Sequence, residues 1–211
     1  QSHYYDDTSN RILQLGQPVH TTALVSYHQG HEVVLFLTGP GCGVKKILPI
    51  IEQHKQQFMT MCDASSANYT EVDESLAARW IICFFLVHGR RKFFELLNSF
   101  PEASQFVIDQ IAKVYEHDAH CKREGYTPEQ RLRYHQAYSG PVMAGLHHYL
   151  VTQFAYPHQT NVVEPNSPLG EAMAYLLRHW SALTQFLKVA GAPLDNSLAE
   201  RTIKMAISNR K

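Results

Sequence analysis

The sequence carries no excess of charge of either sign, because 19 lysine and arginine residues balance 19 aspartate and glutamate residues. A protein that coats nucleic acid with its whole surface needs a surplus of cations to neutralise phosphates. The balance argues against that class and leaves local basic clusters. These are Arg90-Arg91-Lys92, Lys122-Arg123, Arg131 with Arg133, and Arg201 with Lys204, Arg210 and Lys211. Any one of them is equally compatible with a solvated helix face.

Paired cysteines and long apolar runs are also missing. None of the four cysteines forms a C-x-x-C pair, so buried free thiols in a reducing cytosol are the simplest interpretation. Apolar runs such as 80–87 are too short to span a bilayer, and no signal-peptide pattern is present. The sequence therefore predicts a cytoplasmic globular protein, whose 211 residues suffice for one core with an inserted subdomain.

The first ninety residues alternate between β-rich and helical stretches. Strands are expected in 3–15, 21–28, 31–37, 58–62 and 80–87, and helices in 44–55 and 71–79. Gln29-Gly30 is a tight hairpin signal between two of the strands. The order of three strands, helix, strand, helix and strand is typical of an RNase H-like mixed sheet.

Strand signals are scarce in the following hundred residues. Helices are expected in 93–97, 103–116, 128–138, 142–154 and 169–189, with proline and glycine between them. We therefore predict an α/β fold with a large all-helical insertion before the last helix. Its parts are the first section of the core (1–92), the helical insertion (93–189) and the closing helix (190–211).

Carboxylates stand in three separate segments of the predicted core. Asp6 and Asp7 lie in the first strand, Asp63 follows the strand 58–62, and Glu200 lies in the first turn of the closing helix. Three carboxylates brought together from distant parts of a chain are what a two-metal phosphoryl-transfer site requires. Mg²⁺ is a hard cation that prefers such oxygen ligands.

Each of these carboxylates also has an ordinary structural interpretation. Asp6 and Asp7 suit a turn, and Asp63 suits a turn or a helix N-cap. The segment from Ser197 to Glu200 fits a capping box, in which the glutamate bonds back to the N-cap amide. Judged locally, the capping box is the better interpretation of Glu200, so the choice depends on a wider pattern.

That wider pattern is an ordered set of four motifs. They are Tyr4-Tyr5-Asp6-Asp7-Thr8, the run 58–63 followed by Tyr69, His88-Gly89-Arg90-Arg91-Lys92-Phe93, and Asp195-Asn196-Ser197-Leu198-Ala199-Glu200-Arg201 followed by Arg210-Lys211. The third matches the pattern H-x-R-R-K-F, and the fourth is similar to D-N-N-x-x-E-R with a later arginine-lysine pair. In this order the motifs resemble those of the DDE transposases of insertion sequence family sixty-six.

The resemblance implies DNA cleavage and strand transfer by a bacterial transposase at the nucleoid. Asp6, Asp63 and Glu200 would hold two Mg²⁺ ions, or Mn²⁺ in their place, and Asp7 is a lesser candidate than Asp6. The implied partners are terminal-repeat and target DNA, with self-association on DNA. The expected DNA contacts are Arg90, Arg91, Lys92, Arg201, Lys204, Arg210 and Lys211, and the further candidate site residues are His88, Asp195 and Asn196.

Some positions depart from the family pattern. Ser197 replaces the second asparagine of D-N-N, Ala64 replaces a glycine, and Phe85 replaces the cysteine of a C-x-x-H element. Without that cysteine a zinc site is not expected, and we interpret His88 as a structural or DNA-proximal residue. The chain begins at Gln1 and ends within the closing motif, as expected for an excised domain or a truncated copy. An inactive remnant that binds only DNA or a protein, and a stand-alone nuclease or resolvase, are the alternatives.

Overall fold

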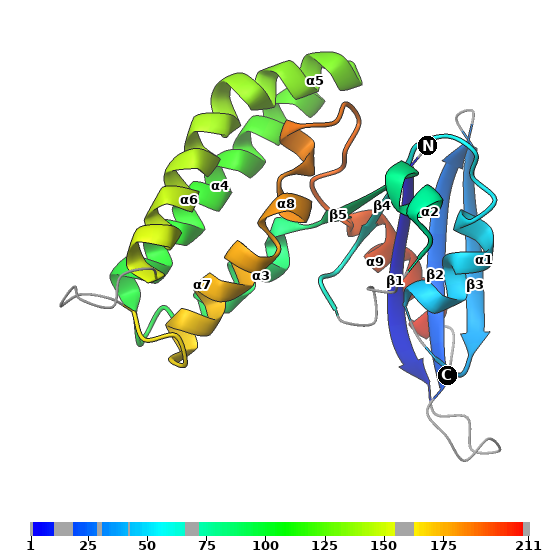
Figure 1. Ribbon diagram of the computed structural model, residues 1–211, viewed down its shortest axis with the longest axis horizontal. Helices are drawn as coiled ribbons and strands as arrows, with labels where there is room; N and C mark the ends of the chain where they lie inside the picture. The colour runs from blue at the N-terminus through cyan, green and yellow to red at the C-terminus, as the bar shows by residue number, and fades with distance from the viewer. Residues whose placement is uncertain are drawn as a thin grey trace. The chain divides into compact units, whose positions relative to one another are not determined.

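The computed structural model describes residues 2–10, 19–28, 31–41, 43–65, 72–154 and 163–208. The chain forms two compact units, Gln1–Phe84 with Asp195–Lys211 and Phe85–Leu194. Every strand of the described ranges lies in the first unit, and the second is helical (Figure 1). The helical unit begins earlier than the sequence predicted, because the segment after Phe85 turns into a helix at once.

A five-stranded mixed sheet in the order β3-β2-β1-β4-β5 forms the centre of the first unit. Its strands are β1 (Ser2–Asn10), β2 (Val19–His28), β3 (His31–Gly39), β4 (Phe58–Cys62) and β5 (Trp80–Phe84). β2 pairs antiparallel with β1 and β3, whereas β4 pairs parallel with β1 and β5. The structure confirms the predicted α/β class and the mixed sheet, with β1 as the central strand.

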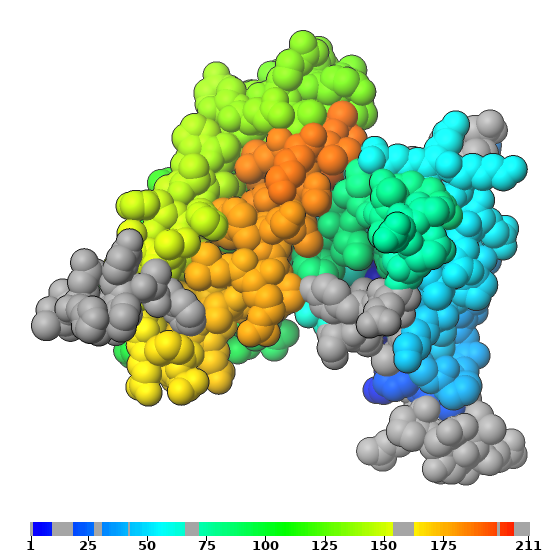
Figure 2. Space-filling view, viewed as in Figure 1, coloured from blue at the N-terminus to red at the C-terminus, as the bar shows by residue number. Residues whose placement is uncertain are grey.

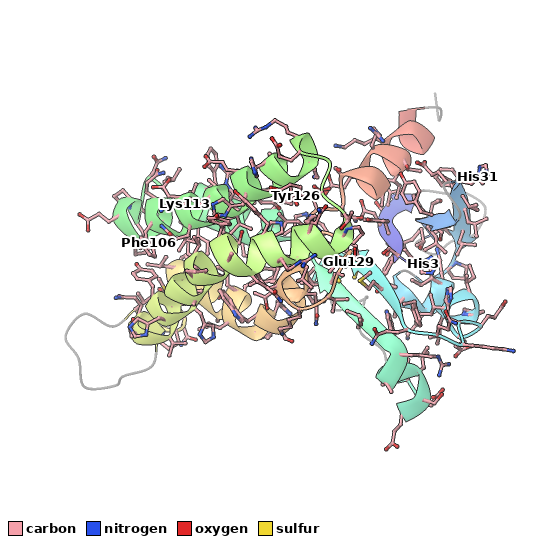
Figure 3. All side chains as sticks on the ribbon, turned by 90° about the horizontal axis from the view of Figure 1, so that it is seen from above. His3, His31, Phe106, Lys113, Tyr126 and Glu129 are labelled. Atoms are coloured by element: carbon pink, nitrogen blue, oxygen red, sulfur yellow. The ribbon has the colours of Figure 1, made fainter. Side chains whose placement is uncertain are left out.

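Three helices accompany this sheet. They are α1 (Val44–Ile51), α2 (Glu74–Arg79) and α9 (Ser197–Ser208). α1 lies on one face of the sheet and α9 on the other, where it contacts β1 and β2 (Figures 1 and 3). α1 is amphipathic, and its buried residues Val44, Ile47 and Ile51 share one side at helical spacing.

The second unit is built from helices, and α4 is the longest of those that the structure describes. The elements are α3 (Leu86–Glu95), α4 (Pro101–Arg123), α5 (Pro128–Tyr134), the π-helical turn η2 (His135–Ser139), α6 (Gly140–Phe154), α7 (Pro168–Arg178), α8 (Trp180–Leu183) and the 3-10 turn η3 (Gln185–Leu187). Figure 2 shows the side chains of α6 and α7 packed against each other. None of the described helices is long and apolar enough to cross a membrane.

Two predicted elements differ from the structure. The strand expected in 80–87 ends at Phe84, and α3 starts at Leu86, so the basic segment Arg90-Arg91-Lys92 lies on a helix. The single helix expected in 169–189 breaks at His179, whose backbone leaves helical geometry. Neither break follows a proline or glycine, so no local signal marks it.

A buried ionic cluster holds α4 and α5 together. Asp118 is 2% exposed and accepts hydrogen bonds from Arg131 at 2.6 Å and Lys122 at 2.9 Å, with His135 Nε2 at 3.2 Å. Burial opposes ionisation, but the His135 hydrogen bond and the two cations outweigh it and hold the pKa of Asp118 well below its ordinary value. Arg131 also donates to the carbonyl of Ala192 at 2.7 Å. Arg131 and Lys122 are therefore structural cations.

Candidate active site

Asp6 and Asp7 lie on opposite faces of the sheet, because successive side chains of a strand alternate. The Asp7 carboxylate accepts the N–H of Gly43 at 2.6 Å and the hydroxyl of Thr22. Gly43 is the N-cap of α1, so its hydrogen bond to Asp7 connects the start of that helix to the sheet. Asp6 points to the opposite face, on which α9 lies. Asp7 therefore has a structural task that Asp6 does not share.

Asp63 is brought beside Asp6 by the register of the parallel strands. β1 and β4 pair Tyr4 with Met61, and two further steps at the same offset reach Asp6 and Asp63. Neighbouring strands lie roughly 4.8 Å apart, and paired residues point to the same face. Asp63 also accepts the N–H of Ser65 at 3.4 Å, which forms a turn at the strand end.

Glu200 reaches this face on the closing helix. The residue before α9, Asn196, is 1% exposed and donates its side-chain amide to the carbonyl of Tyr5 at 3.2 Å. Glu200 follows one turn later, and its N–H donates to the carbonyl of Asn196 at 3.1 Å. The helix start is therefore fixed to β1 next to Asp6, and Glu200 lies in its first turn.

The capping-box interpretation of Glu200 does not apply. α9 begins at Ser197, whereas a capping box needs the serine at the preceding, N-cap position. Ser197 instead donates its hydroxyl and its N–H to Asp195 Oδ1, at 2.8 and 3.2 Å. Asp195 thus orders the turn that leads into the helix.

The surroundings of Asp6 raise the pKa of its carboxyl group. Burial, and after it the charges of Asp63, Glu200 and Asp7, raise the pKa of Asp6 to about 6, although the Asp7 N–H opposes the shift. Carboxylates placed close together without a counter-charge disfavour full ionisation in this way. This face of the sheet therefore favours binding of a proton or a cation.

The donor atoms suit a hard divalent cation. They are the carboxylate oxygens of Asp6, Asp63 and Glu200, with Asn196 Oδ1, which is buried and has no hydrogen-bond partner among the described residues. Mg²⁺ takes oxygen ligands and completes its octahedron with water. Among the described residues, the His, Cys, Asp and Glu side chains form no group of three or more that could hold a metal as they stand.

The amino-acid sequence matches one known protein family. Residues 2–211 match the sequence profile of the Transposase IS66 family. The chain belongs to the IS66 transposase family. No solved structure matches it.

Two relatives of this IS66-family chain come from Sinorhizobium fredii, and both are named as uncharacterized. "Uncharacterized protein y4jD" is 31% identical over 132 residues, which cover 62% of this chain and 24% of the relative. "Uncharacterized protein y4hP" is 28% identical over 140 residues, covering 61% and 24%. The matched region thus spans about a quarter of each relative's length.

The basic residues of α3 differ in their surroundings. Arg91 pairs with Glu95 at 2.9 Å, and Lys92 Nζ lies 4.9 Å from the ring centre of Tyr175. Arg90 Nε is buried without a hydrogen-bond partner in the described part of the chain. Arg90 and Glu116 both line a cavity of about 480 Å³. Of the three, Arg90 is thus the side chain with unmet hydrogen-bonding capacity.

The remaining predicted contacts lie on or after α9 and at the start of α3. Arg201 and Lys204 are exposed on α9, whereas Arg210 and Lys211 lie outside the described residues. The ring of His88 contacts the ring of Phe85, with centroids 4.4 Å apart. The aromatic residue at the position of the missing cysteine thus packs against His88.

Proposed function

We propose that this chain is the catalytic domain of a DDE transposase, which cleaves the DNA of an insertion sequence and joins its strands. The observation that carries the proposal is the cluster of Asp6, Asp63 and Glu200, in which burial and then the two neighbouring carboxylates raise the pKa of Asp6. Perturbed carboxylates of this kind concentrate at functional sites. Family membership supports the same activity class.

Each carboxylate has a defined part in this proposal. Asp6 and Asp63, on neighbouring parallel strands, and Glu200, on the closing helix, would bind the divalent ions. Bound Mg²⁺ would supply Lewis-acid chemistry, activating the attacking oxygen and stabilising the leaving oxygen. The buried amide of Asn196 holds the helix against β1 and so positions Glu200.

The DNA contacts follow from charge and exposure. Arg201 and Lys204 are exposed on the helix that carries Glu200, so they would contact phosphates close to the carboxylate cluster. Arg90 adds a guanidinium with unmet hydrogen-bonding capacity on α3. Arg91 and Lys92 would contribute only after giving up their present contacts with Glu95 and Tyr175.

The sheet supports an RNase H-like core as part of the same proposal. Three antiparallel strands are followed by two parallel ones in the order β3-β2-β1-β4-β5, as that fold requires. The helical unit enters between β5 and α9, where the proposed insertion belongs. Self-association on DNA and nucleoid location are likewise proposed.

The first test of the proposed site is metal binding, measured on the full chain. Millimolar Mg²⁺ or Mn²⁺ should raise the unfolding temperature, because a ligand present at ten times its Kd adds about 1.4 kcal/mol. The Asp63→Asn variant should lose this effect, and the matched control Glu52→Gln, at an exposed position after α1, should keep it. An unchanged metal response in Asp63→Asn would overturn the site.

DNA nicking then separates the catalytic domain from an inactive remnant. The parent should nick terminal-repeat DNA only with metal present, and Asp63→Asn should not. Metal binding without nicking, in a protein that includes the rest of the transposase, would favour a domain that only binds DNA. Nicking without any strand transfer would favour a stand-alone nuclease.

A further inference from the structure

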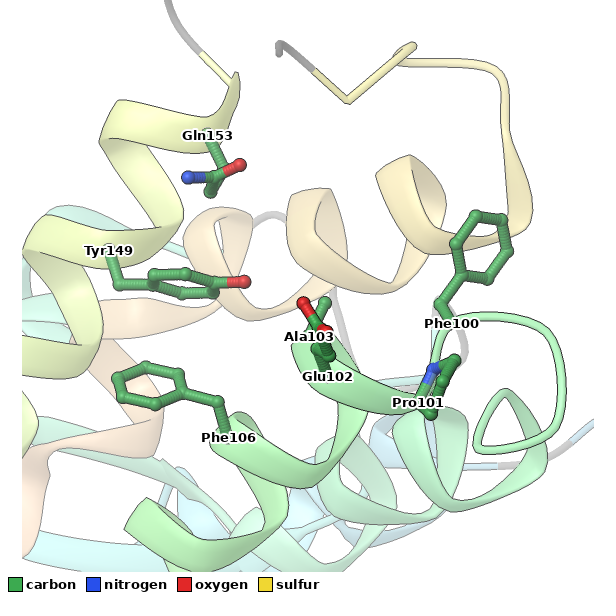
Figure 4. Close-up of a pocket in the computed structure, with 7 residues that line it drawn as sticks. All are labelled: Phe100, Pro101, Glu102, Ala103, Phe106, Tyr149 and Gln153. Atoms are coloured by element: carbon green, nitrogen blue, oxygen red, sulfur yellow. The ribbon is translucent and has the colours of Figure 1, made fainter.

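An open cavity of about 610 Å³ lies within the helical unit, where the first turn of α4 meets the end of α6 (Figure 4). Its volume is in the range of ligand-binding sites, roughly 300–1,000 Å³. It has no part in the carboxylate cluster, which belongs to the other unit. The cavity therefore needs an explanation that transposition chemistry does not supply.

Aromatic side chains form one wall of this cavity. The rings of Phe106 and Tyr149 contact each other, with centroids 4.4 Å apart and planes at 48°. Phe106 is 37% exposed, and Figure 4 shows Phe100 across the cavity from the pair. Exposed rings gathered at a cavity are typical of a binding surface.

The charge of the cavity is negative. Among the described residues that line it, Glu102 is the only charged one. Burial together with the Glu102 charge raises the pKa of Tyr149, so the carboxylate lies near the phenol. The positive end of the α4 dipole and the negative end of the α6 dipole both lie here and oppose each other. α6 contains no lysine, arginine, aspartate or glutamate, so the charge of Glu102 dominates.

A negative aromatic cavity selects against nucleic acid and in favour of a cation. Phosphates would meet the Glu102 carboxylate, and none of the seven lining residues that the structure describes is basic. A guanidinium is planar, stacks on aromatic faces and donates a fork of hydrogen bonds to a carboxylate. Its attraction to a ring face adds about 0.5 to 2 kcal/mol in general. An arginine side chain therefore satisfies all the features of the cavity.

We propose that this cavity binds an arginine side chain of a partner protein. The guanidinium stacks on the Tyr149 and Phe106 wall and donates hydrogen bonds to Glu102. The side-chain amide oxygen of Gln153, which lies above Tyr149 in Figure 4, accepts a further one. The site thus gives the helical unit a protein-recognition task that is separate from DNA chemistry.

The test uses a short peptide, acetyl-Gly-Arg-Gly-amide, titrated into the full chain. Ring resonances of Phe106 and Tyr149, followed by NMR, should shift saturably. The same peptide with glutamine in place of arginine should leave them unchanged. Equal shifts with both peptides, or shifts produced by a single-stranded oligonucleotide but not by the arginine peptide, would overturn the proposal.

A matched pair of variants assigns the effect to the carboxylate. Glu102 directly follows the proline that opens α4, and Glu129 directly follows the proline that opens α5, and both are exposed. Glu102→Gln should weaken arginine-peptide binding about threefold or more, whereas Glu129→Gln should leave it unchanged. Unchanged binding in Glu102→Gln, with the fold intact by circular dichroism, contradicts the proposal.

Discussion

Asn196 donates its side-chain amide to the carbonyl of Tyr5 at 3.2 Å, across 191 positions of the sequence. The bond joins the start of the last helix to the central strand, immediately before Asp6. It also explains why an asparagine one turn before Glu200 is buried. A residue that the sequence offered as part of a motif is thus the physical link between two of the proposed catalytic elements.

Replacing this asparagine should loosen the helix. Asn196→Ala removes the bond and leaves the Tyr5 carbonyl buried without its donor, which costs about 1 to 3 kcal/mol. Chemical denaturation should reveal the loss. Ser197→Ala is the control, because the Ser197 hydroxyl binds only Asp195 in an exposed turn, and it should cost well under 1 kcal/mol. Equal losses in the two variants would show that the link to β1 contributes nothing.

The alternation of Asp6 and Asp7 leads to opposite effects of the same substitution. Burial and neighbouring carboxylates raise the pKa of Asp6 from 3.8 to about 6, so the folded state holds this proton more tightly than the unfolded state. Its contribution to stability is therefore greatest below about pH 4 and falls as the pH rises through 6. Asp6→Asn removes the free-energy cost of holding an ionised carboxylate at this position. It should therefore stabilise the metal-free protein at pH 7.5 by up to about 3 kcal/mol, less any solvent screening.

The difference between Asp6→Asn and the parent should shrink as the pH falls from 7 to 4. Denaturation at several pH values measures it directly. Asp7→Asn should instead destabilise by about 1 to 3 kcal/mol, because the Gly43 N–H and the Thr22 hydroxyl lose a charged acceptor. If both variants were destabilised alike, Asp6 would be a structural residue rather than a member of a strained carboxylate cluster.

Alanine substitutions at two helix glycines of the second unit should have opposite effects on stability. A Cβ added at Gly89 would lie 2.5 Å from Leu176 Cδ2, and Leu176 is fully buried in α7. Gly89→Ala should therefore destabilise by about 1 to 3 kcal/mol. Gly145 has nothing within 4 Å of such an atom, so Gly145→Ala should be stabilising by about 0.5 to 1 kcal/mol. Thermal denaturation measures both changes. A Gly89→Ala variant as stable as the parent would show that α3 and α7 do not pack closely at this position.

Elements with strong local signals could be predicted from the sequence. The apolar run 58–62 predicted β4, and the β-rich runs 21–28 and 31–37 predicted β2 and β3, within a residue or two. The predicted hairpin turn Gln29-Gly30 lies outside the described residues. The helical periodicity likewise gave α6. These segments are set by local pattern, which a single sequence contains.

Features that depend on distant contacts could not be predicted. The basic clusters of the sequence did not reveal that Arg131 binds the buried Asp118, because nothing local places the two together. The π-helical turn that brings His135 Nε2 within 3.2 Å of Asp118 has no pattern of its own. The capping box was likewise a wrong interpretation, because α9 begins at Ser197, and the contact of Asn196 with Tyr5 is one that no local pattern predicts.

The most direct test of the proposed activity is Glu200→Gln. The substitution keeps the size of the side chain and its capacity for hydrogen bonds, but it removes the charge that a Mg²⁺ site needs. Because Ser197 is already inside the helix, no capping box is at stake, and stability should change by less than about 1 kcal/mol. Metal-dependent cleavage of terminal-repeat DNA should be abolished, in a protein that includes the rest of the transposase.

The control for that experiment is Glu171→Gln, a glutamate in the first turn of α7 in the other unit. It makes the same chemical change at the same helix position, so it should leave cleavage at the parental rate. Glu200 differs from Glu171 in its proximity to Asp6, whose pKa its charge helps to raise after burial and the charge of Asp63. Cleavage at the parental rate by Glu200→Gln would remove this residue from the site. A loss of several kcal/mol in stability would instead assign it a structural role.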